Sequence, residues 1–206
     1  MKKLISLLLS VLFAVQAHAG AYSITLTTTG SSVVTQTAGG GIGWTNASQC
    51  KVKDSAFGEV ALTPGDRSDY VNTRAYTGLI SFPPFTTITG VRVEFNGYSD
   101  VADELTMTEV YLTNLGVPQT MAQNASKPMP DSPSWADKGL YVGGDGDLWG
   151  LTASGMMGVI QAKFFGMAFW IEGTGGTGAN GYIDDSRIIV YYDVRPPLKS
   201  LLGAGL

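Results

Sequence analysis

Residues 182–194 read YIDDSRIIVYYDV, and this stretch predicts a long β-strand. Its second half is almost entirely apolar or aromatic, with Ile188, Val190 and Tyr192 expected to face one way. The residues between them, Ile189 and Tyr191, would face the other way. Because β-branched and aromatic residues favour strands, this segment needs a sheet to join, which the rest of the chain must supply.

The preceding chain has the composition of many short strands joined by turns. It is rich in Gly, Thr, Val, Tyr and Phe, with a glycine every few residues. The expected strands cover residues 22–27 (running into Val33-Val34), 57–62, 88–98, 105–112, 140–142 and 164–171, and residues 79–82, closed by Pro83-Pro84, are a further candidate. We expect the strands over residues 88–98 and 105–112 to be neighbours, and the strand over residues 164–171 to be central and buried on both faces. Residues 173–181 should form a hairpin or loop tip, and residues 154–163 the single helical turn. The pattern predicts an all-β fold, an antiparallel two-sheet jelly-roll-like β-sandwich in a single domain over residues 20–194.

Two segments differ from this pattern. Residues 116–137 contain four prolines and many polar side chains without periodicity, which predicts a surface excursion from the domain. Residues 195–206 follow the last strand and form an apolar tail with four leucines, Leu198, Leu201, Leu202 and Leu206. An apolar terminus of this kind is expected to dock, either on its own domain or on a neighbouring subunit.

The first 19 residues have the pattern of a secretory signal peptide. Two lysines precede an apolar run of about twelve residues, and Ala17-His18-Ala19 resembles a cleavage site. The run is shorter than the roughly 20 residues that span a bilayer, so we expect an exported protein without a transmembrane segment. The mature chain would begin near Gly20 and be secreted or reside at the cell surface.

Cleavage at this point would remove the only histidine, His18, and leave a single cysteine, Cys50. Without imidazole, Ser-His and Cys-His nucleophile pairs and the usual mixed zinc sites cannot form. Cys50 has no partner for an internal disulfide, so we interpret it as a buried thiol, with an intermolecular bridge as the alternative. Removing Lys2 and Lys3 leaves 11 basic and 17 acidic residues, a formal charge of −6, which argues against a nucleic-acid partner.

The last third of the chain carries three motifs in a fixed order: Asp147-Leu148-Trp149-Gly150, then Phe165-Gly166, then a closing strand from Asp184 to Tyr192 with the pattern DxxRIxVYY. In this it resembles β-sandwich domains of bacteriophage structural proteins (tail, fibre or decoration modules) and of exported bacterial proteins. The resemblance implies a sandwich fold in a bacterial exported protein. It implies no catalytic residues.

Several residues in and around these motifs are candidates for binding. Asp145 and Asp147, with Asp184 and Asp185 if the loops meet in space, have the oxygen ligands of a structural calcium site, the one cofactor that we consider. The alternative for Asp147 is a turn cap, and for Trp149 a buried ring. Trp135, in the proline-rich excursion, and Trp44 are the other candidates for stacking on a sugar, whereas Trp170 is expected to pack in the core.

A carboxylate enzyme is a further alternative. Asp103, Glu104 and Glu109 form the nearest acidic cluster, and strand alternation would place Asp103 and Glu109 on one face. Their spacing does not match the Glu-x-Asp-x-x-Glu strand of sandwich-fold glucanases, so a solvated strand edge explains them more simply.

We therefore predict an exported, non-catalytic structural or adhesive β-sandwich that associates with itself or with a surface partner through its terminal segments. The N-terminal strand, with Tyr22, Ile24 and Leu26 on one face, could add to a neighbour's sheet edge, and the four tail leucines could dock beside it. The first alternative is a secreted carbohydrate-binding module with a glycan partner. The second, which the sequence favours less, is a secreted glycoside hydrolase.

Overall fold

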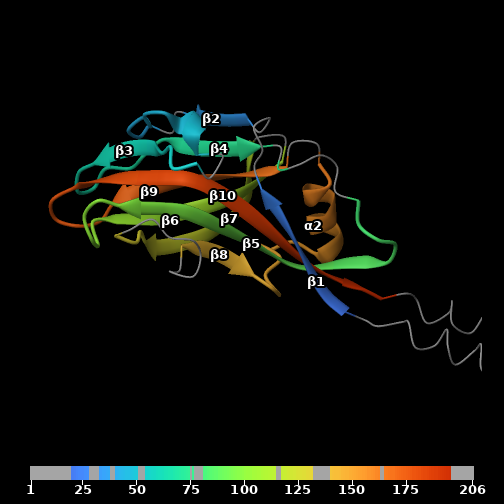
Figure 1. The fold of residues 1–206 in the computed structure, drawn as a ribbon. Coiled ribbons are helices and arrows are strands. Elements are labelled where there is room, and N and C mark those ends of the chain that lie inside the picture. Colours follow the sequence, from blue (N-terminus) through green and yellow to red (C-terminus); the bar gives the residue numbers. More distant parts are fainter. Residues whose placement is uncertain are drawn as a thin grey trace, which may run out of the picture.

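The structure is a computed structural model, and it describes residues 20–27, 33–37, 40–50, 54–74, 76, 81–114, 117–131, 140–162 and 165–195. These residues form two antiparallel β-sheets that pack face to face (Figure 1). The predicted all-β, two-sheet, single-domain sandwich is confirmed. In this described part of the chain, no helix has both the length and the apolar character needed to cross a bilayer.

The first sheet, sheet A, is built around the last strand of the domain. β10 is sixteen residues long and pairs with the fourteen-residue β5 over nearly its whole length. The order across the sheet is β1-β10-β5-β8, and β3 pairs with β10 on the same side as β1. The strands are β1 (Gly20–Thr27), β3 (Gly58–Leu62), β5 (Thr86–Ser99), β8 (Tyr141–Gly144) and β10 (Ala179–Val194).

The second sheet, sheet B, has the order β2-β4-β9-β6-β7, with β9 at its centre. Its strands are β2 (Val33–Thr37), β4 (Tyr70–Arg74), β6 (Leu105–Asn114), β7 (Val117–Pro128) and β9 (Gly166–Gly173). A short 3-10 helix, η1 (Ala47–Gln49), lies beside β2 and β3, and α2 (Ala153–Ile160) covers part of β5. Thr152 caps α2, since its hydroxyl accepts a hydrogen bond from the Gly155 N–H at 3.1 Å.

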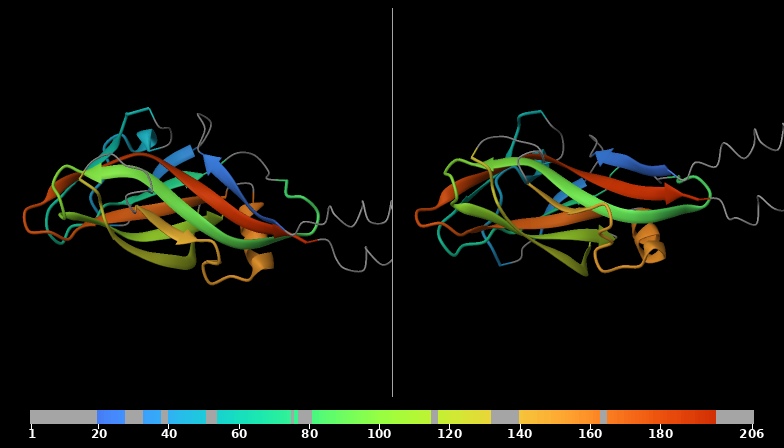
Figure 2. Two further views of the ribbon diagram at one scale, coloured as in Figure 1. Left: turned by 60° about the horizontal axis from the view of Figure 1, so that its bottom comes forward. Right: turned by 90° about the horizontal axis from the view of Figure 1, so that it is seen from below.

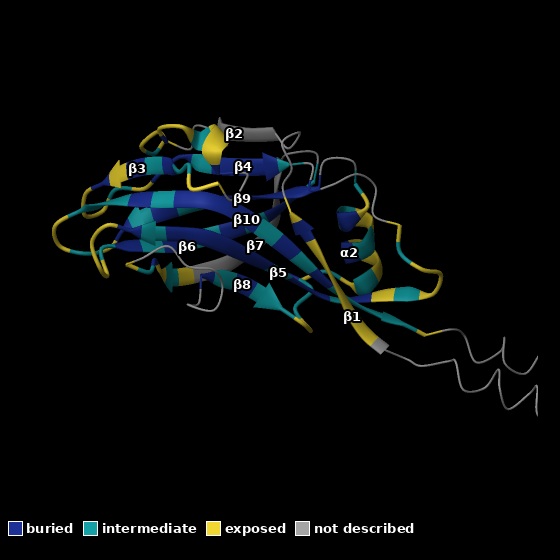
Figure 3. Cartoon of the chain, viewed as in Figure 1, coloured by how far each residue is buried: buried dark blue, intermediate teal, exposed yellow. Residues whose placement is uncertain are grey.

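The core lies between the two sheets, and β4, β5, β6, β9 and β10 contribute most of its buried side chains (Figure 3). Phe169 of β9 sits at its centre. Its ring meets Phe95 of β5 at 4.9 Å and Trp44 at 5.9 Å between centroids, both edge to face. Cys50 is also fully buried, and burial raises the pKa of its thiol to about 12. The interpretation of Cys50 as a buried thiol agrees with this position.

The structure corrects two expectations about how the strands are connected, and it places Ser81 and Phe82, the described part of the candidate strand 79–82, outside the strands. The strands expected as neighbours, β5 and β6, lie in opposite sheets. Residues 173–181 do not close a hairpin, because β9 and β10 also belong to different sheets. The hydrophobic alternation that revealed these strands reports which side chains face the core, and it contains no information about the neighbouring strand.

The proline-rich segment is also more regular than expected. Val117–Pro128 of the predicted excursion forms β7, which pairs with β6 at the edge of sheet B. Edge strands tolerate proline because one side of their backbone needs no hydrogen-bond donors, which explains how Pro118 and Pro128 fit. Residues 132–137 of the segment, including Trp135, lie outside the described residues, as do the expected signal peptide and the tail leucines Leu198, Leu201, Leu202 and Leu206.

Candidate functional site

The strand β1 forms a long edge of sheet A. All eight of its residues pair with β10, from Gly20 opposite Val194 to Thr27 opposite Arg187. Within the described ranges no strand pairs with its other side. In an antiparallel sheet, the backbone groups of successive residues point alternately to the strand on one side and to the strand on the other. About half of the backbone N–H and C=O groups of β1 therefore point outward, away from β10.

The side chains of β1 are uncharged, and most of them are exposed. No residue from 20 to 50 is charged. Tyr22 is 45% exposed and Ile24 36% exposed, while Leu26 is 2% exposed and belongs to the core. The prediction of Leu26 as an assembly residue is therefore wrong, because its side chain holds β1 on the sandwich, whereas Tyr22 and Ile24 remain accessible. In Figure 3 most of β1 has the colour of exposed residues.

Other sheet edges carry features that prevent pairing. The edge of β3 is covered by Thr45, which exchanges two backbone hydrogen bonds with Glu59 at 2.7 and 2.9 Å. The edge strand β7 contains Pro118, Lys127 and Pro128, and β8 has only four residues. Prolines, lysines and short edges all oppose the addition of another strand. The fifth edge strand, β2, is uncharged but has five residues, against eight in β1.

Two of the tryptophans proposed as ligand-binding residues are structural. Trp44 is 7% exposed, and its indole N–H donates to the Asp69 carbonyl at 2.9 Å. Trp149 is 2% exposed and donates to the Val91 carbonyl, also at 2.9 Å. Neither ring has a face open to a sugar, so these two binding predictions are corrected. For Trp149 the burial agrees with the other interpretation of the sequence, a buried ring beside the turn at Gly150. For Trp44 the sequence could not separate the two roles, because glycine-rich loops accommodate both buried and exposed rings.

Trp170, by contrast, is more exposed than the sequence suggested. It lies on the outer face of β9, where Tyr70 stacks on it at 4.6 Å between ring centroids and the Arg67 guanidinium lies 4.8 Å from its ring. Tyr111 meets Tyr70 edge to face at 5.9 Å. We call Tyr70, Tyr111 and Trp170 the aromatic row. All three rings are half-buried, so β9 is not buried on both faces as expected.

Carboxylates border the aromatic row. Glu109 of β6 lies opposite Trp170 and accepts a hydrogen bond from the Tyr111 hydroxyl. Glu172 accepts from the Thr108 hydroxyl at 3.1 Å. Burial, followed by the contact with Glu109, raises the pKa of Tyr111, which therefore stays a neutral donor. This face of sheet B thus combines aromatic surface with hydrogen-bonding groups.

The acidic cluster expected for a hydrolase does not come together. Glu104 is engaged in the loop between β9 and β10, because it accepts N–H bonds from Thr177 and Gly178 at 2.8 and 3.0 Å. These bonds lower the pKa of its carboxyl group. Asp103 lies in the turn before β6, whereas Glu109 lies within β6 beyond a β-bulge and accepts a hydrogen bond from the Tyr111 hydroxyl.

The four aspartates suggested for calcium also form two separate groups. Asp145 accepts from the Thr89 hydroxyl at 2.8 Å, and Asp147 caps its turn by accepting from the Trp149 N–H at 2.8 Å. Asp184 instead accepts from the Asn96 amide at 3.1 Å, next to Asp185. Thr89 and Asn96 are seven residues apart on β5, or about 23 Å. The loops therefore do not meet, and no group of three or more potential ligands occurs among the described residues.

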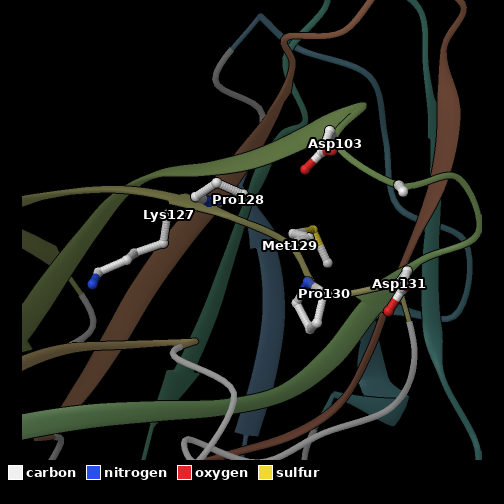
Figure 4. A pocket seen from close by; sticks show the side chains of 7 residues that line it. Asp103, Lys127, Pro128, Met129, Pro130 and Asp131 are labelled. Atoms are coloured by element: carbon white, nitrogen blue, oxygen red, sulfur yellow. The ribbon is translucent and has the colours of Figure 1, made fainter.

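An open hollow of about 500 Å³ lies where β7 ends beside the turn between β5 and β6. It is lined by Ala102, Asp103, Lys127, Pro128, Met129, Pro130 and Asp131. Figure 4 shows Lys127 extending away from the two carboxylates, and no aromatic ring lines the hollow. Its geometry does not select a ligand.

Comparison with known proteins gives structural matches at low sequence identity only. No protein-family model and no curated protein sequence matches this chain. Among solved structures, a crystal structure with a xylogluco-oligosaccharide is similar over 87% of this chain and 36% of the other, with 13% identity and a TM-score of 0.40. A structure of domains C and D of another protein matches at 11% identity, 87% and 62% coverage and a TM-score of 0.38.

A third match is the structure of T=1 particles derived from an infectious bursal virus. It has 9% identity, a TM-score of 0.28, and coverage of 92% of this chain and 42% of the viral one. The chain spans less than two thirds of each of these proteins.

Proposed function

We propose that this protein is an exported, non-catalytic structural component that associates with further copies of itself through the edge of β1. The observation that carries the proposal is the eight-residue, uncharged edge strand whose outer side has no partner among the described strands. An exposed strand edge of this kind is a template for pairing with another chain.

A second copy is the partner that this edge fits best. An antiparallel strand can pair with its own copy around a two-fold axis, because the same groups then face each other in both directions. Each hydrogen bond gained contributes about 0.5–1.5 kcal/mol, and no charged side chain of β1 opposes the approach. The pairing would join two copies of sheet A into one continuous sheet.

Export and the lack of catalysis rest on the sequence. The first 19 residues have the composition of a signal peptide, and no histidine occurs after His18. Glu104 and Glu109, two of the acidic residues considered for hydrolysis, are engaged in hydrogen bonds. These features favour a structural role over an enzymatic one.

Lysines on β1 test the assembly edge. Ser23 and Thr25 are exposed and lie on the face opposite Leu26, so the double variant Ser23→Lys/Thr25→Lys leaves the core intact. In a two-fold pair the four lysines would face one another and repel. We expect light scattering to give a multiple of the single-chain mass for the native protein, and the mass of one chain for the variant.

The matched control is Ser81→Lys/Gln161→Lys, which adds the same charge at two exposed positions outside the strands. It should keep the native mass. A native protein that is monomeric at every concentration, or a β1 variant with the mass of the control, would refute assembly through β1.

A carbohydrate-binding role is the second candidate, and the aromatic row favours it. Aromatic rings with adjacent carboxylates and hydroxyls are typical of sites that bind sugars. On a glycan array, we expect Trp170→Ala to abolish any signal that the native protein gives, with Trp135→Ala testing the residue that the sequence favoured. Thermal unfolding would show that both variants fold. An array without signal for the native protein would remove this candidate.

A further inference from the structure

The inner face of sheet A extends beyond sheet B at one end of the molecule. There β1, the end of β10 and the beginning of β5 run past α2 (Figures 1 and 2). One row across these strands contains Tyr22, Tyr192 and Ile88, which pair in register. The next rows inward contain Val190 and Ile188, which are fully buried, so this row belongs to the core-facing side of the sheet.

Side chains on this inner face would normally be buried, but here those of Tyr22 and Ile24 on β1 are exposed. Tyr22 stacks on Tyr192 at 5.6 Å between ring centroids, and Phe82 meets Tyr192 edge to face at 5.3 Å. Tyr22 and Ile24 still expose 45% and 36% of their surface. We call Tyr22, Ile24, Phe82 and Tyr192 the overhang patch.

A groove continues the patch toward the helix. It lies between the beginning of β5 and α2, has a volume of about 540 Å³, and is lined by Thr86, Thr87, Ile88, Thr152, Ala153, Ser154 and Met157. None of these residues is charged. Ile88 lines the groove and is the strand partner of Tyr192 in the patch, so the groove and the patch are adjacent.

We propose that residues 196–206 of the same chain dock on the overhang patch and the adjoining groove. β10 ends at Val194, which pairs with Gly20 on one side and Thr86 on the other, at this end of the sheet. The next residue, Arg195, donates its N–H to the Phe85 carbonyl at 3.3 Å. The chain therefore enters the apolar tail directly beside the exposed surface.

The tail has the length and the chemistry to cover this surface. Its 11 residues reach up to about 36 Å when extended, and Leu198, Leu201 and Leu202 have the spacing of one apolar face. Lys199 is its only charged residue. Because the tail is tethered to Arg195, its effective concentration at the patch is of millimolar order, which favours its own domain over a second copy.

This docking is independent of assembly through β1. The tail would cover the inner face of sheet A, whereas assembly uses the outward backbone edge of β1. Hydrogen exchange and mass therefore report separately on the two proposals.

The test is the double variant Leu201→Asp/Leu202→Asp. The control is Lys199→Asp/Ser200→Asp, which places aspartates at the two polar positions directly before Leu201. Hydrogen exchange is measured in peptides covering residues 20–27, 81–88 and 152–157. We expect about tenfold faster exchange in these peptides for the leucine variant, native rates for the control, and no change in mass. A chain that ends at Arg195 should match the leucine variant.

Two results would overturn the proposal. Native exchange rates in both the leucine variant and the shortened chain would mean that the tail does not cover the patch. A loss of mass together with faster exchange would mean that the tail reaches another copy. The experiment is repeated in the Ser23→Lys/Thr25→Lys background, where the effect of the leucines should persist even if assembly through β1 is absent.

Discussion

Replacing Phe169 by Ala is expected to lower the free energy of unfolding by about 3–5 kcal/mol, as for other aromatic core truncations. The ring is fully buried at the centre of sheet B and meets Phe95 of sheet A and Trp44 of the loop beside it. Removing the ring leaves a cavity between the sheets and eliminates its contacts with Phe95 and Trp44. Urea unfolding followed by far-UV circular dichroism measures the change.

Phe169→Leu is the matched control, since it keeps an apolar side chain in the same position. We expect it to cost no more than about half of the alanine value, because most of the cavity stays filled. An alanine variant within about 1 kcal/mol of the native protein would show that the two sheets are held together elsewhere.

Replacing Glu94 by Ala is expected to destabilise the fold by about 3 kcal/mol. The Glu94 side chain is 3% exposed and forms ion pairs with Arg92, at 2.7 Å, and with Arg187. The pair with Arg187 connects β5 with β10, the two longest strands of sheet A, whereas Arg92 lies on β5 beside Glu94. Without the carboxylate, two half-covered guanidinium groups would lie close together with no opposite charge between them.

Asp193→Ala is the control for Glu94. Asp193 also pairs with an arginine, but Arg195 is 71% exposed, and surface ion pairs contribute between 0 and about 1 kcal/mol. Thermal unfolding at low and high salt should show a large effect for Glu94→Ala and almost none for Asp193→Ala. Equal effects would mean that burial of the Glu94 pairs contributes nothing beyond ordinary surface charge.

The two sets of variants separate stability from assembly. Phe169 and Glu94 lie away from the edge of β1, so their substitution should lower the unfolding temperature while the folded protein keeps its native mass. The β1 lysines should change the mass with little change in stability.

The sequence alone determined the elements whose signal is local. Residues 182–194 alternate as a strand does and form most of β10, and the helical pattern near residue 154 is α2. The face of β1 was also predictable, because Tyr22, Ile24 and Leu26 repeat every second residue. The turn cap by Asp147 followed from its short carboxylate beside glycine.

Only the tertiary structure decided which strands are neighbours, and hence which side chains are accessible. β5 and β6 alternate equally well and lie in different sheets, and β7 was hidden by prolines that only an edge strand tolerates. Trp44, predicted to bind a ligand, lies in the core, and Trp170, predicted to be core, is half-buried on the outer face of β9. The physical reason is that alternation depends on adjacent residues, whereas edge position and burial depend on pairings between residues far apart in the chain, such as Gly20 with Val194.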